Sequence, residues 1–470
     1  MTLAALLFDH PRRGAEPLLH SATETMTAAD AQADADAVAA RLRAVGVEAG
    51  QGVAVQLPNG PRAITAMFGV WRAGAVFVPV NPRSPAAERA EAVAATRPAV
   101  LLTAAGLEPV ADPLPNDADV AFVTWTSGTT GRPKPILHTH AGYLELIDRV
   151  LAPLRGSSPV DTDKRPTPNL VPVSLALNAG IYNVLFGLRA GAEIVVMDGF
   201  DPRVFADLVA RFSIRSTVLP PAAMAMLSDA ADVDDLTPLR YVRSITAALS
   251  PLQARRFTER FGVVVLNGYG QAELGEVIGW TAADAREHPE KVGAVGRPHP
   301  GVAIRIAPAD AAESRSPVAA DEVGRLLVRP PSTAVGIARS RFDDEGFVDT
   351  GDLARVDADG FVWIEGRASD VINRGGNKVF PEQVEEVLRL VPAVQEAAVV
   401  GVADDRLGEV PVAFVVVSAA VDDGELVAVC REHLAPYKVP VRFRRVQALP
   451  RSEVGKVLRR ELAARETSGR

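Results

Sequence analysis

The chain has 470 residues, 48% of them hydrophobic and 23% charged, which is enough for two or more domains with a large core. Its formal net charge of −8 argues against a general role on nucleic acid or membrane surfaces. A single cysteine, Cys430, excludes an intrachain disulfide framework and a cysteine metal cluster, and its apolar surroundings predict a buried thiol. No apolar run approaches the roughly 20 residues that span a bilayer, and the N-terminus lacks the charged lead of a signal peptide, so we expect a cytoplasmic protein.

Helices and strands alternate through the first half of the chain. The apolar pattern predicts helices at 35–45, 61–73, 85–95, 180–190 and 204–212. It predicts strands at 52–57, 76–80, 100–102, 193–197, 216–219 and a buried one at 263–266. This alternation indicates βαβ units and a mainly parallel sheet. The segments 105–118 and 155–168 are rich in Pro, Asp and Ser and are expected to be loops.

The predicted pattern of secondary structure changes twice in the second half of the chain. From Gly293 onward we expect shorter strands with charged turns, as in a small β subdomain. After residues 366–370 the pattern predicts helices and strands of a separate unit of about 100 residues, at 381–390, 397–402, 412–417 and 426–434. The predicted fold class is therefore α/β, with doubly wound sheets and a β subdomain in residues 1–368 and an α+β C-terminal domain in residues 369–470.

Residues 126–134 read TSGTTGRPK and suit an anion. Hydroxyl groups can donate hydrogen bonds to phosphate oxygens, and they come from Thr126, Ser127, Thr129 and Thr130. Gly128 lets the backbone approach the anion, and Lys134 adds positive charge. The spacing does not fit the Walker A pattern. Because residues 120–125 are apolar and β-prone, we expect this loop to follow a strand.

This run resembles the phosphate loop of the adenylate-forming superfamily, which comprises acyl-CoA synthetases, peptide-synthetase adenylation domains and luciferases. The resemblance spans almost the whole chain and continues, in family order, through the motifs at 267–273, 350–352, 366–370, 374–376 and 450–456. It implies ATP-dependent activation of a carboxylic acid as an acyl-adenylate, with pyrophosphate released. The acyl group would then pass to a thiol, either of CoA or of a carrier-protein pantetheine.

The resemblance also assigns roles to residues of the nucleotide site. Residues 126–130 and Lys134 would bind the ATP phosphates, with Thr126 counted among the catalytic residues. Glu273 would hold Mg²⁺ and is also counted among the catalytic residues. Adenine would pack on Tyr269, with Asn267 and Gly268 beside it. A carboxylate can accept hydrogen bonds from both ribose hydroxyls, which is the predicted role of Asp352, with Arg367 supporting the sugar.

Two further roles belong to the C-terminal domain. The resemblance implies that Lys456 enters the active site and bridges the carboxylate and α-phosphate oxygens during adenylation. It also implies that Asp370 is the hinge on which a mobile C-terminal domain turns between the adenylation and transfer states.

The acid pocket departs from the usual pattern of the superfamily. Leu175 stands where many members carry a His or an aromatic residue, and Ile245 and Thr246 occupy positions often held by Gly. Branched side chains there predict a short pocket and a small or compact acid.

Three functions remain open at this stage. The first is an acid:CoA or acid:carrier-protein ligase that uses ATP and Mg²⁺ and acts on a small-molecule acid. The second is adenylation of a very small oxyacid such as nitrite, with transfer to an amine. The third is a non-catalytic scaffold homologue, which the presence of Lys456, Glu273 and Asp352 disfavours. We expect no nucleic-acid or membrane partner, and a monomer or a homodimer; the acid, the acceptor and the oligomeric state stay open.

Overall fold

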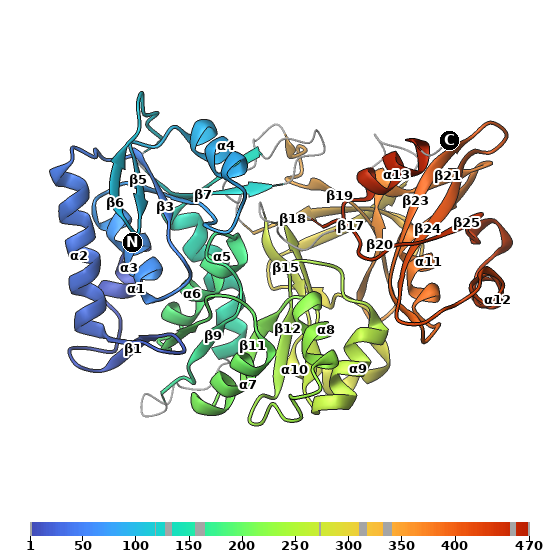
Figure 1. The fold of residues 1–470 in the computed structure, drawn as a ribbon, viewed down its shortest axis with the longest axis horizontal. Coiled ribbons are helices and arrows are strands. Elements are labelled where there is room, and N and C mark those ends of the chain that lie inside the picture. Colours follow the sequence, from blue (N-terminus) through green and yellow to red (C-terminus); the bar gives the residue numbers. More distant parts are fainter. Residues whose placement is uncertain are drawn as a thin grey trace.

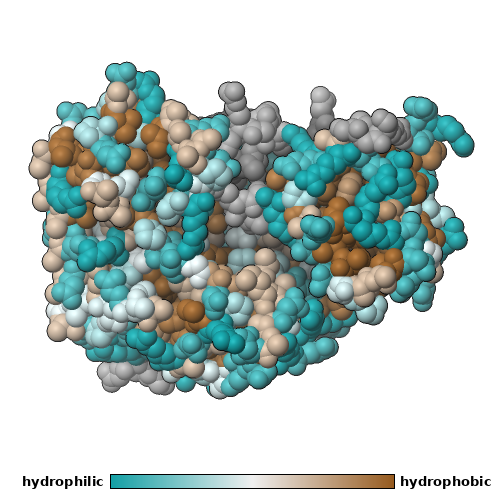
Figure 2. Space-filling model, viewed as in Figure 1, coloured by the Kyte–Doolittle hydropathy of each residue, from teal (hydrophilic) through white to brown (hydrophobic). Residues whose placement is uncertain are grey.

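A computed structural model describes residues 2–117, 119–126, 134–155, 165–271, 274–309, 317–331, 341–451 and 457–468. Within these ranges the chain forms five sheets, arranged as a large N-terminal part and a smaller unit that carries the C-terminus (Figure 1). The predicted α/β class is confirmed. No helix in the described ranges is both long enough and apolar enough to cross a membrane. Hydrophilic and apolar residues are interspersed over the face shown in Figure 2.

The two largest sheets are built mainly from parallel strands. A six-stranded sheet has the order β6-β5-β3-β4-β7-β8, with the strands β3 (Gly52–Gln56), β4 (Val76–Pro79), β5 (Val100–Thr103), β6 (Gly106–Pro109), β7 (Val120–Thr126) and β8 (Lys134–Thr139). A seven-stranded sheet has the order β13-β12-β11-β9-β10-β1-β2, with β1 (Pro17–His20), β2 (Thr25–Thr27), β9 (Asn169–Val171), β10 (Ile194–Val196), β11 (Ser216–Leu219), β12 (Tyr241–Ser244) and β13 (Val264–Leu266).

Helices connect the strands of these sheets, as the alternation predicted. They are α1 (Ala5–Phe8), α2 (Ala28–Ala44), α3 (Pro61–Arg72), α4 (Ala86–Thr96), α5 (His140–Arg155), α6 (Asn178–Arg189), α7 (Pro202–Arg211), α8 (Pro221–Asp229) and α9 (Pro251–Phe261). One buried cluster joins α2, α3, α5 and α6 to strands of both sheets, and a second packs α7, α8 and α9 on the other face of the seven-stranded sheet. The doubly wound arrangement follows from these two apolar faces.

Smaller antiparallel sheets follow. A three-stranded sheet contains β14 (Gly268–Gln271), β15 (Gly275–Gly279) and β16 (Arg297–Pro298), next to α10 (Ala282–Glu287) and the short η1 (Pro289–Lys291). A four-stranded sheet contains β17 (Ala303–Pro308), β18 (Gly324–Arg329), β19 (Val348–Val356) and β20 (Val362–Arg367). Both sheets contribute residues to one apolar cluster, so they pack against each other.

The C-terminal unit begins after the short η3 (Ala368–Asp370). Its sheet contains β21 (Ile372–Arg374), β22 (Asn377–Val379), β23 (Val394–Asp404), β24 (Gly408–Val417) and β25 (Arg442–Arg445). The remaining elements of this unit are α11 (Pro381–Leu388), α12 (Asp423–His433), η4 (Pro436–Lys438) and α13 (Arg459–Ser468). Apolar clusters cover both faces of the sheet, and Cys430 is fully buried in one of them, as predicted.

Several sequence predictions of local structure were wrong. The expected loop at 105–118 contains β6, which pairs with β5. Helix α2 starts at Ala28 rather than 35, because Thr27 and Asp30 form a capping box at its N-terminus. The strands after Gly293 do not all shorten, since β16 has two residues but β19 has nine. Strand β13 is only partly buried, because it lies at the edge of its sheet.

Candidate active site

The phosphate loop follows a strand, as the sequence predicted. Strand β7 ends at Thr126 and β8 begins at Lys134, and these two residues are register partners across the hairpin. The loop therefore begins and ends at paired positions of two neighbouring strands. Residues 127–133 and the side chains of Thr126 and Lys134 lie outside the described part of the structure, so their predicted phosphate contacts stay predictions.

A buried, uncharged histidine packs within this hairpin. His138 is buried, stacks on Phe122 at 4.5 Å between ring centroids, and shares a 2.8 Å hydrogen bond between its Nε2 and the Thr124 hydroxyl. Burial lowers the pKa of His138 to about 3. The ring therefore stays uncharged at neutral pH, and it acts as a packing element below the loop.

Tyr269 and Asp352, predicted to bind adenine and ribose, meet directly. The Tyr269 hydroxyl donates a hydrogen bond to Asp352 Oδ2. Gln271 Nε2 donates to the same carboxylate oxygen at 3.1 Å and to the Thr350 carbonyl at 2.8 Å. Arg367 Nε lies 2.8 Å from Asp352 Oδ1. These four side chains, from β14, β19 and β20, form one polar network, which we call the Asp352 network: Tyr269, Gln271, Asp352 and Arg367.

Burial within the Asp352 network is uneven. The side chain of Asp352 is 7% exposed, whereas that of Arg367 is 44% exposed. Burial, and next the neighbouring Asp352 carboxylate, raises the pKa of Tyr269 well above its ordinary value, so its hydroxyl keeps the proton it donates. The network thus presents a fixed carboxylate behind an arginine that solvent or a ligand can reach.

Gly270 allows the motif around Tyr269 to form a strand that pairs closely with β15. A Cβ atom at Gly270 would lie 2.2 Å from the Gly275 carbonyl oxygen of β15, so only glycine permits this approach. Asn267 closes the start of the strand: its Nδ2 donates to the Ala294 carbonyl at 3.3 Å and its Oδ1 accepts from Gly268 N at 3.0 Å. The side chain of Asn267 is thereby occupied in positioning the backbone.

A buried ion pair ties this strand pair to the neighbouring sheet. Arg243 of β12 bonds to Glu276 of β15, and Glu276 Oε1 also lies 2.9 Å from His299 Nε2. Burial opposes ionisation of Glu276, but Arg243 and His299 outweigh it and lower its pKa. The three side chains join β12, β15 and the segment before β17, and they place the end of β12 beside the Asp352 network.

Two of the three predicted acid-pocket residues share one apolar cluster. Leu175 is 6% exposed, and Ile245 is partly buried against the same cluster. Thr246 is half-buried beside Ile245, at the end of β12. The Leu175 amide donates to Asn59 Oδ1 at 3.0 Å, and Asn59 Nδ2 donates to the Val173 and Met197 carbonyls at 3.1 and 3.0 Å. Asn59, which the sequence did not single out, fixes the segment that carries Leu175.

The predicted hinge residue is held by an arginine near the end of the chain. Arg459 Nε lies 3.5 Å from Asp370 Oδ2, and Arg459 Nη2 donates to Glu382 Oε1 at 2.9 Å. Arg459 also bonds to Glu385 and donates to the Val399 carbonyl at 3.2 Å. We call these four side chains the Arg459 cluster: Asp370, Glu382, Glu385 and Arg459.

The Arg459 cluster holds more negative than positive charge. Its three carboxylates surround one guanidinium, and Glu385 is additionally approached by Arg389 at 3.6 Å. Burial, reinforced by Glu385 and Asp370, raises the pKa of Glu382 to about 7 in spite of Arg459. Glu382 Oε2 is buried without a hydrogen-bond partner among the described residues and lies against Gly366, the penultimate residue of β20.

The magnesium prediction and the catalytic lysine are untested by the geometry. Glu273 and Lys456 lie outside the described ranges. The part of the chain that is described has no group of three or more His, Cys, Asp or Glu side chains suited to a metal ion.

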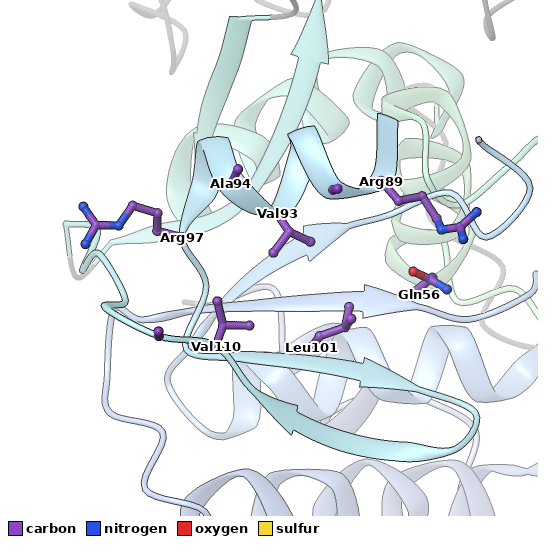
Figure 3. A pocket seen from close by; sticks show the side chains of 9 residues that line it. Gln56, Arg89, Val93, Ala94, Arg97, Leu101 and Val110 are labelled. Atoms are coloured by element: carbon purple, nitrogen blue, oxygen red, sulfur yellow. The ribbon is translucent and has the colours of Figure 1, made fainter. Parts of the chain in front are cut away.

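A surface groove of about 520 Å³ lies elsewhere, between α4 and the β5–β6 hairpin (Figure 3). None of the predicted site residues lines it. Val93, Leu101 and Val110 point into it, with Arg89 and Arg97 at its two ends. It therefore belongs to the packing of α4, a helix without a fully buried residue, and not to the Asp352 network.

Sequence reasoning missed two residues of these networks. Gln271 lies two residues after Tyr269 in β14, and strand periodicity places both side chains on one face, so recognition of a strand here would have found it. Arg459 lies 89 residues from Asp370, and no local pattern relates them.

Comparison with known proteins extends over nearly the whole chain. The family model described as AMP-binding enzyme matches residues 9–114 and 105–338, and the model of the AMP-binding enzyme C-terminal domain matches residues 383–456. Sulfoacetate–CoA ligase of Cupriavidus necator is 31% identical over 89% of this chain and 88% of its own. Feruloyl-CoA synthase of an Amycolatopsis species is 32% identical over 96% of both chains.

A solved structure shares the fold of this chain. The ATP-bound MatB of Rhodopseudomonas palustris matches with a TM-score of 0.84 at 25% identity and covers 99% of both chains. The similarity therefore includes the C-terminal unit as well as the parallel sheets.

Proposed function

Since this chain belongs to the AMP-binding enzyme family, and so to the adenylate-forming superfamily, it is an AMP-forming acid–thiol ligase that uses ATP, and we propose that its acid is compact and that CoA is its acceptor. In the first half-reaction a carboxylate oxygen bonds to the α-phosphorus of ATP while the bond from that phosphorus to the leaving pyrophosphate breaks. In the second, the CoA sulfur bonds to the acyl carbon, AMP leaves, and the thiol proton is released.

The Asp352 network is the observation that carries the nucleotide site in this proposal. A carboxylate has about four lone-pair positions, and Tyr269, Gln271 and Arg367 occupy three of them. One ribose hydroxyl can therefore donate to Asp352 directly. The second can do so when Arg367, the exposed member, turns aside to the sugar or phosphate. The network thus holds the carboxylate ready for the nucleotide.

The roles proposed for the other site residues follow from the family motifs. Thr126 to Thr130 and Lys134 would bind the phosphates, supported by the hairpin base that aligns Thr126 with Lys134. Lys456 would stabilise the charge that develops on the carboxylate and α-phosphate oxygens. Glu273 would hold Mg²⁺, which screens the phosphate charges when it is bound.

We further propose that residues 369–470 form the mobile domain and that Asp370 is its hinge. The sheet of the C-terminal unit contains only strands that follow Asp370, which supports a boundary at this point. Asp370→Pro would fix the backbone torsion φ and trap one orientation, so that one half-reaction survives and the other fails. Equal loss of both half-reactions with an intact fold would argue against this pivot.

The acid is proposed to be compact because Leu175 and Ile245, which share one apolar cluster, place branched apolar groups where the acid pocket is predicted. The relatives named above act on acids as different as sulfoacetate and ferulate, so their names leave the acid of this chain unassigned. No observation on the described residues favours nitrite and an amine over an acid and a thiol.

The test is to identify the products with a panel of acids. Purified protein, ATP and Mg²⁺ are incubated with short aliphatic acids, single-ring aromatic acids and palmitate, and pyrophosphate and AMP are quantified before and after CoA is added. We expect acid-dependent pyrophosphate release, thioester formation only with CoA, and little turnover of palmitate. ADP and phosphate as products, or equal turnover of palmitate, would contradict the proposal.

A further inference from the structure

Thr246 has an unusual backbone conformation. Its φ is +72°, in the left-handed region that glycine adopts readily and β-branched residues avoid. Among the described residues, the other non-glycine residues with positive φ are Arg97, Asp112, Ser213 and Asp321, and all four are exposed. Thr246 is the one that is β-branched and half-buried. A strained residue persists only where its surroundings hold it, and such residues concentrate at ligand sites.

The position of Thr246 is that of a ligand-contacting residue. It follows β12, whose parallel neighbours β11 and β13 end at the same edge of the sheet. Ligands of α/β proteins bind outside the carboxyl ends of parallel strands. Arg243 of β12 is the register partner of Leu266 of β13, and Thr246 and Tyr269 each follow three residues later, beyond this shared edge. Thr246 therefore follows the same sheet edge as Tyr269 of the Asp352 network, and its neighbour Ile245 packs against the apolar cluster that contains Leu175.

The hydroxyl of Thr246 is free for a ligand. Thr246 forms no hydrogen bond with any described residue, and its hydroxyl is not enclosed. Ser244, two residues earlier, offers a contrast, because its hydroxyl is enclosed and has no partner within the described ranges. Of the two hydroxyl groups at the end of β12, only that of Thr246 can be reached from outside.

We propose that Thr246 is a specificity-determining residue, whose strained backbone presents its hydroxyl to a hydrogen-bonding substituent, a hydroxyl or an amino group, on a compact acid. This inference rests on the proposed function. Glycine at this position would relieve the strain, but it would remove both the methyl group that narrows the pocket and the hydroxyl that recognises the substituent. The strain is thus retained where it gives selectivity.

Non-reactive acyl-adenylate mimics test this inference without turnover. The probes are acyl sulfamoyl adenosines made from benzoate and from 2-, 3- and 4-hydroxybenzoate, and from propionate and 2-hydroxypropionate, with dissociation constants measured by calorimetry. Thr246→Val keeps the shape and loses the hydroxyl, Thr246→Ser keeps the hydroxyl, and Ser244→Ala is the control that removes the enclosed hydroxyl.

We expect the wild type to bind at least one hydroxylated mimic more tightly than its parent, by about 5- to 50-fold. Thr246→Val should abolish that preference, whereas Thr246→Ser and Ser244→Ala should keep it. Thr246→Gly should lose the preference without a fall in melting temperature, since glycine suits this backbone. Preferences equal in wild type and Thr246→Val, or none in the wild type, would overturn the inference alone. No binding of any mimic would overturn the proposed function and the inference with it.

Discussion

The Asp352 network and the Arg459 cluster are both built around an Asp–Arg pair, yet their exposure is reversed. In the first, the carboxylate of Asp352 is 7% exposed and Arg367 is 44% exposed. In the second, the guanidinium of Arg459 is 20% exposed and is enclosed by carboxylates, with Asp370 at 32%. Arg367 and Asp370 are only three residues apart, at the junction between β20 and the C-terminal unit.

This difference separates a site that receives a ligand from a cluster that holds the fold. A buried carboxylate with an exposed arginine keeps lone pairs and a positive charge within reach of a nucleotide. A largely enclosed arginine that bonds to three carboxylates and a carbonyl has its hydrogen-bonding capacity used internally. The first arrangement should respond to mutation mainly in catalysis, and the second mainly in stability.

The largest expected effect is loss of Arg459. Arg459→Met leaves the carboxylates of the Arg459 cluster without their cation, which should destabilise the C-terminal unit by about 3 kcal/mol. Hydrogen exchange of peptides from residues 381–404 should then be faster. Arg459→Lys should have a smaller effect, because lysine keeps the charge but loses the planar fork.

The control for this change is Arg445→Met in the same unit. Arg445 pairs with Asp423 at the surface, with side chains 36% and 58% exposed, so its loss should change stability by less than about 1 kcal/mol. If these peptides exchange hydrogen equally fast in both variants, the Arg459 cluster stabilises the C-terminal unit no more than a surface ion pair does.

A smaller effect, on activity alone, is expected at Asp352. Asp352→Asn removes the charge that accepts the ribose hydroxyls, and should lower kcat/KM for ATP by about 10- to 100-fold with the melting temperature little changed. Pyrophosphate release at several ATP concentrations measures this. Asp359→Asn, in the exposed turn between β19 and β20, is the matched control and should behave as wild type. If Asp352→Asn lowered stability but not activity, the Asp352 network would have a structural role and not a ligand-binding one.

The smallest effect concerns pH. The pKa of Glu382 is about 7 in the fold against an ordinary 4.5, so between these values the folded state holds a proton that the unfolded state releases. Stability of the C-terminal unit should therefore fall as pH rises from 4.5 to 7, by at most about 1.4 kcal/mol per pH unit, and level off above 7.

Glu382→Gln should flatten this pH dependence, because glutamine does not titrate. Denaturant unfolding at pH 5, 6, 7 and 8 measures the slope for wild type, for Glu382→Gln and for the exposed control Glu432→Gln, which should keep the wild-type slope. An unchanged slope in Glu382→Gln would mean that another group carries the pH dependence.

Much of the architecture could be predicted from local sequence. Periodicity located α3, β11 and β5 to within a residue or so, because their apolar spacing and flanking prolines or glycines act over short distances. It missed β6, whose residues pair with β5 but carry no strand-like alternation. It also did not predict β14, because the close approach of Gly270 to the Gly275 carbonyl involves a partner strand that local periodicity does not show.

By itself, the sequence determined the family, the α/β class and the identity of Tyr269, Asp352 and Arg367 as candidate nucleotide-binding residues. The reason is that motifs are recognised from the types of residues and their order along the chain. Only the tertiary structure decided that Gln271 joins them on one carboxylate, that Arg459 holds Asp370 from 89 residues away, and that Thr246 is forced to a φ of +72°. The physical reason is that hydrogen bonds, burial and backbone strain depend on which segments meet in space, and that meeting is a property of the packed core.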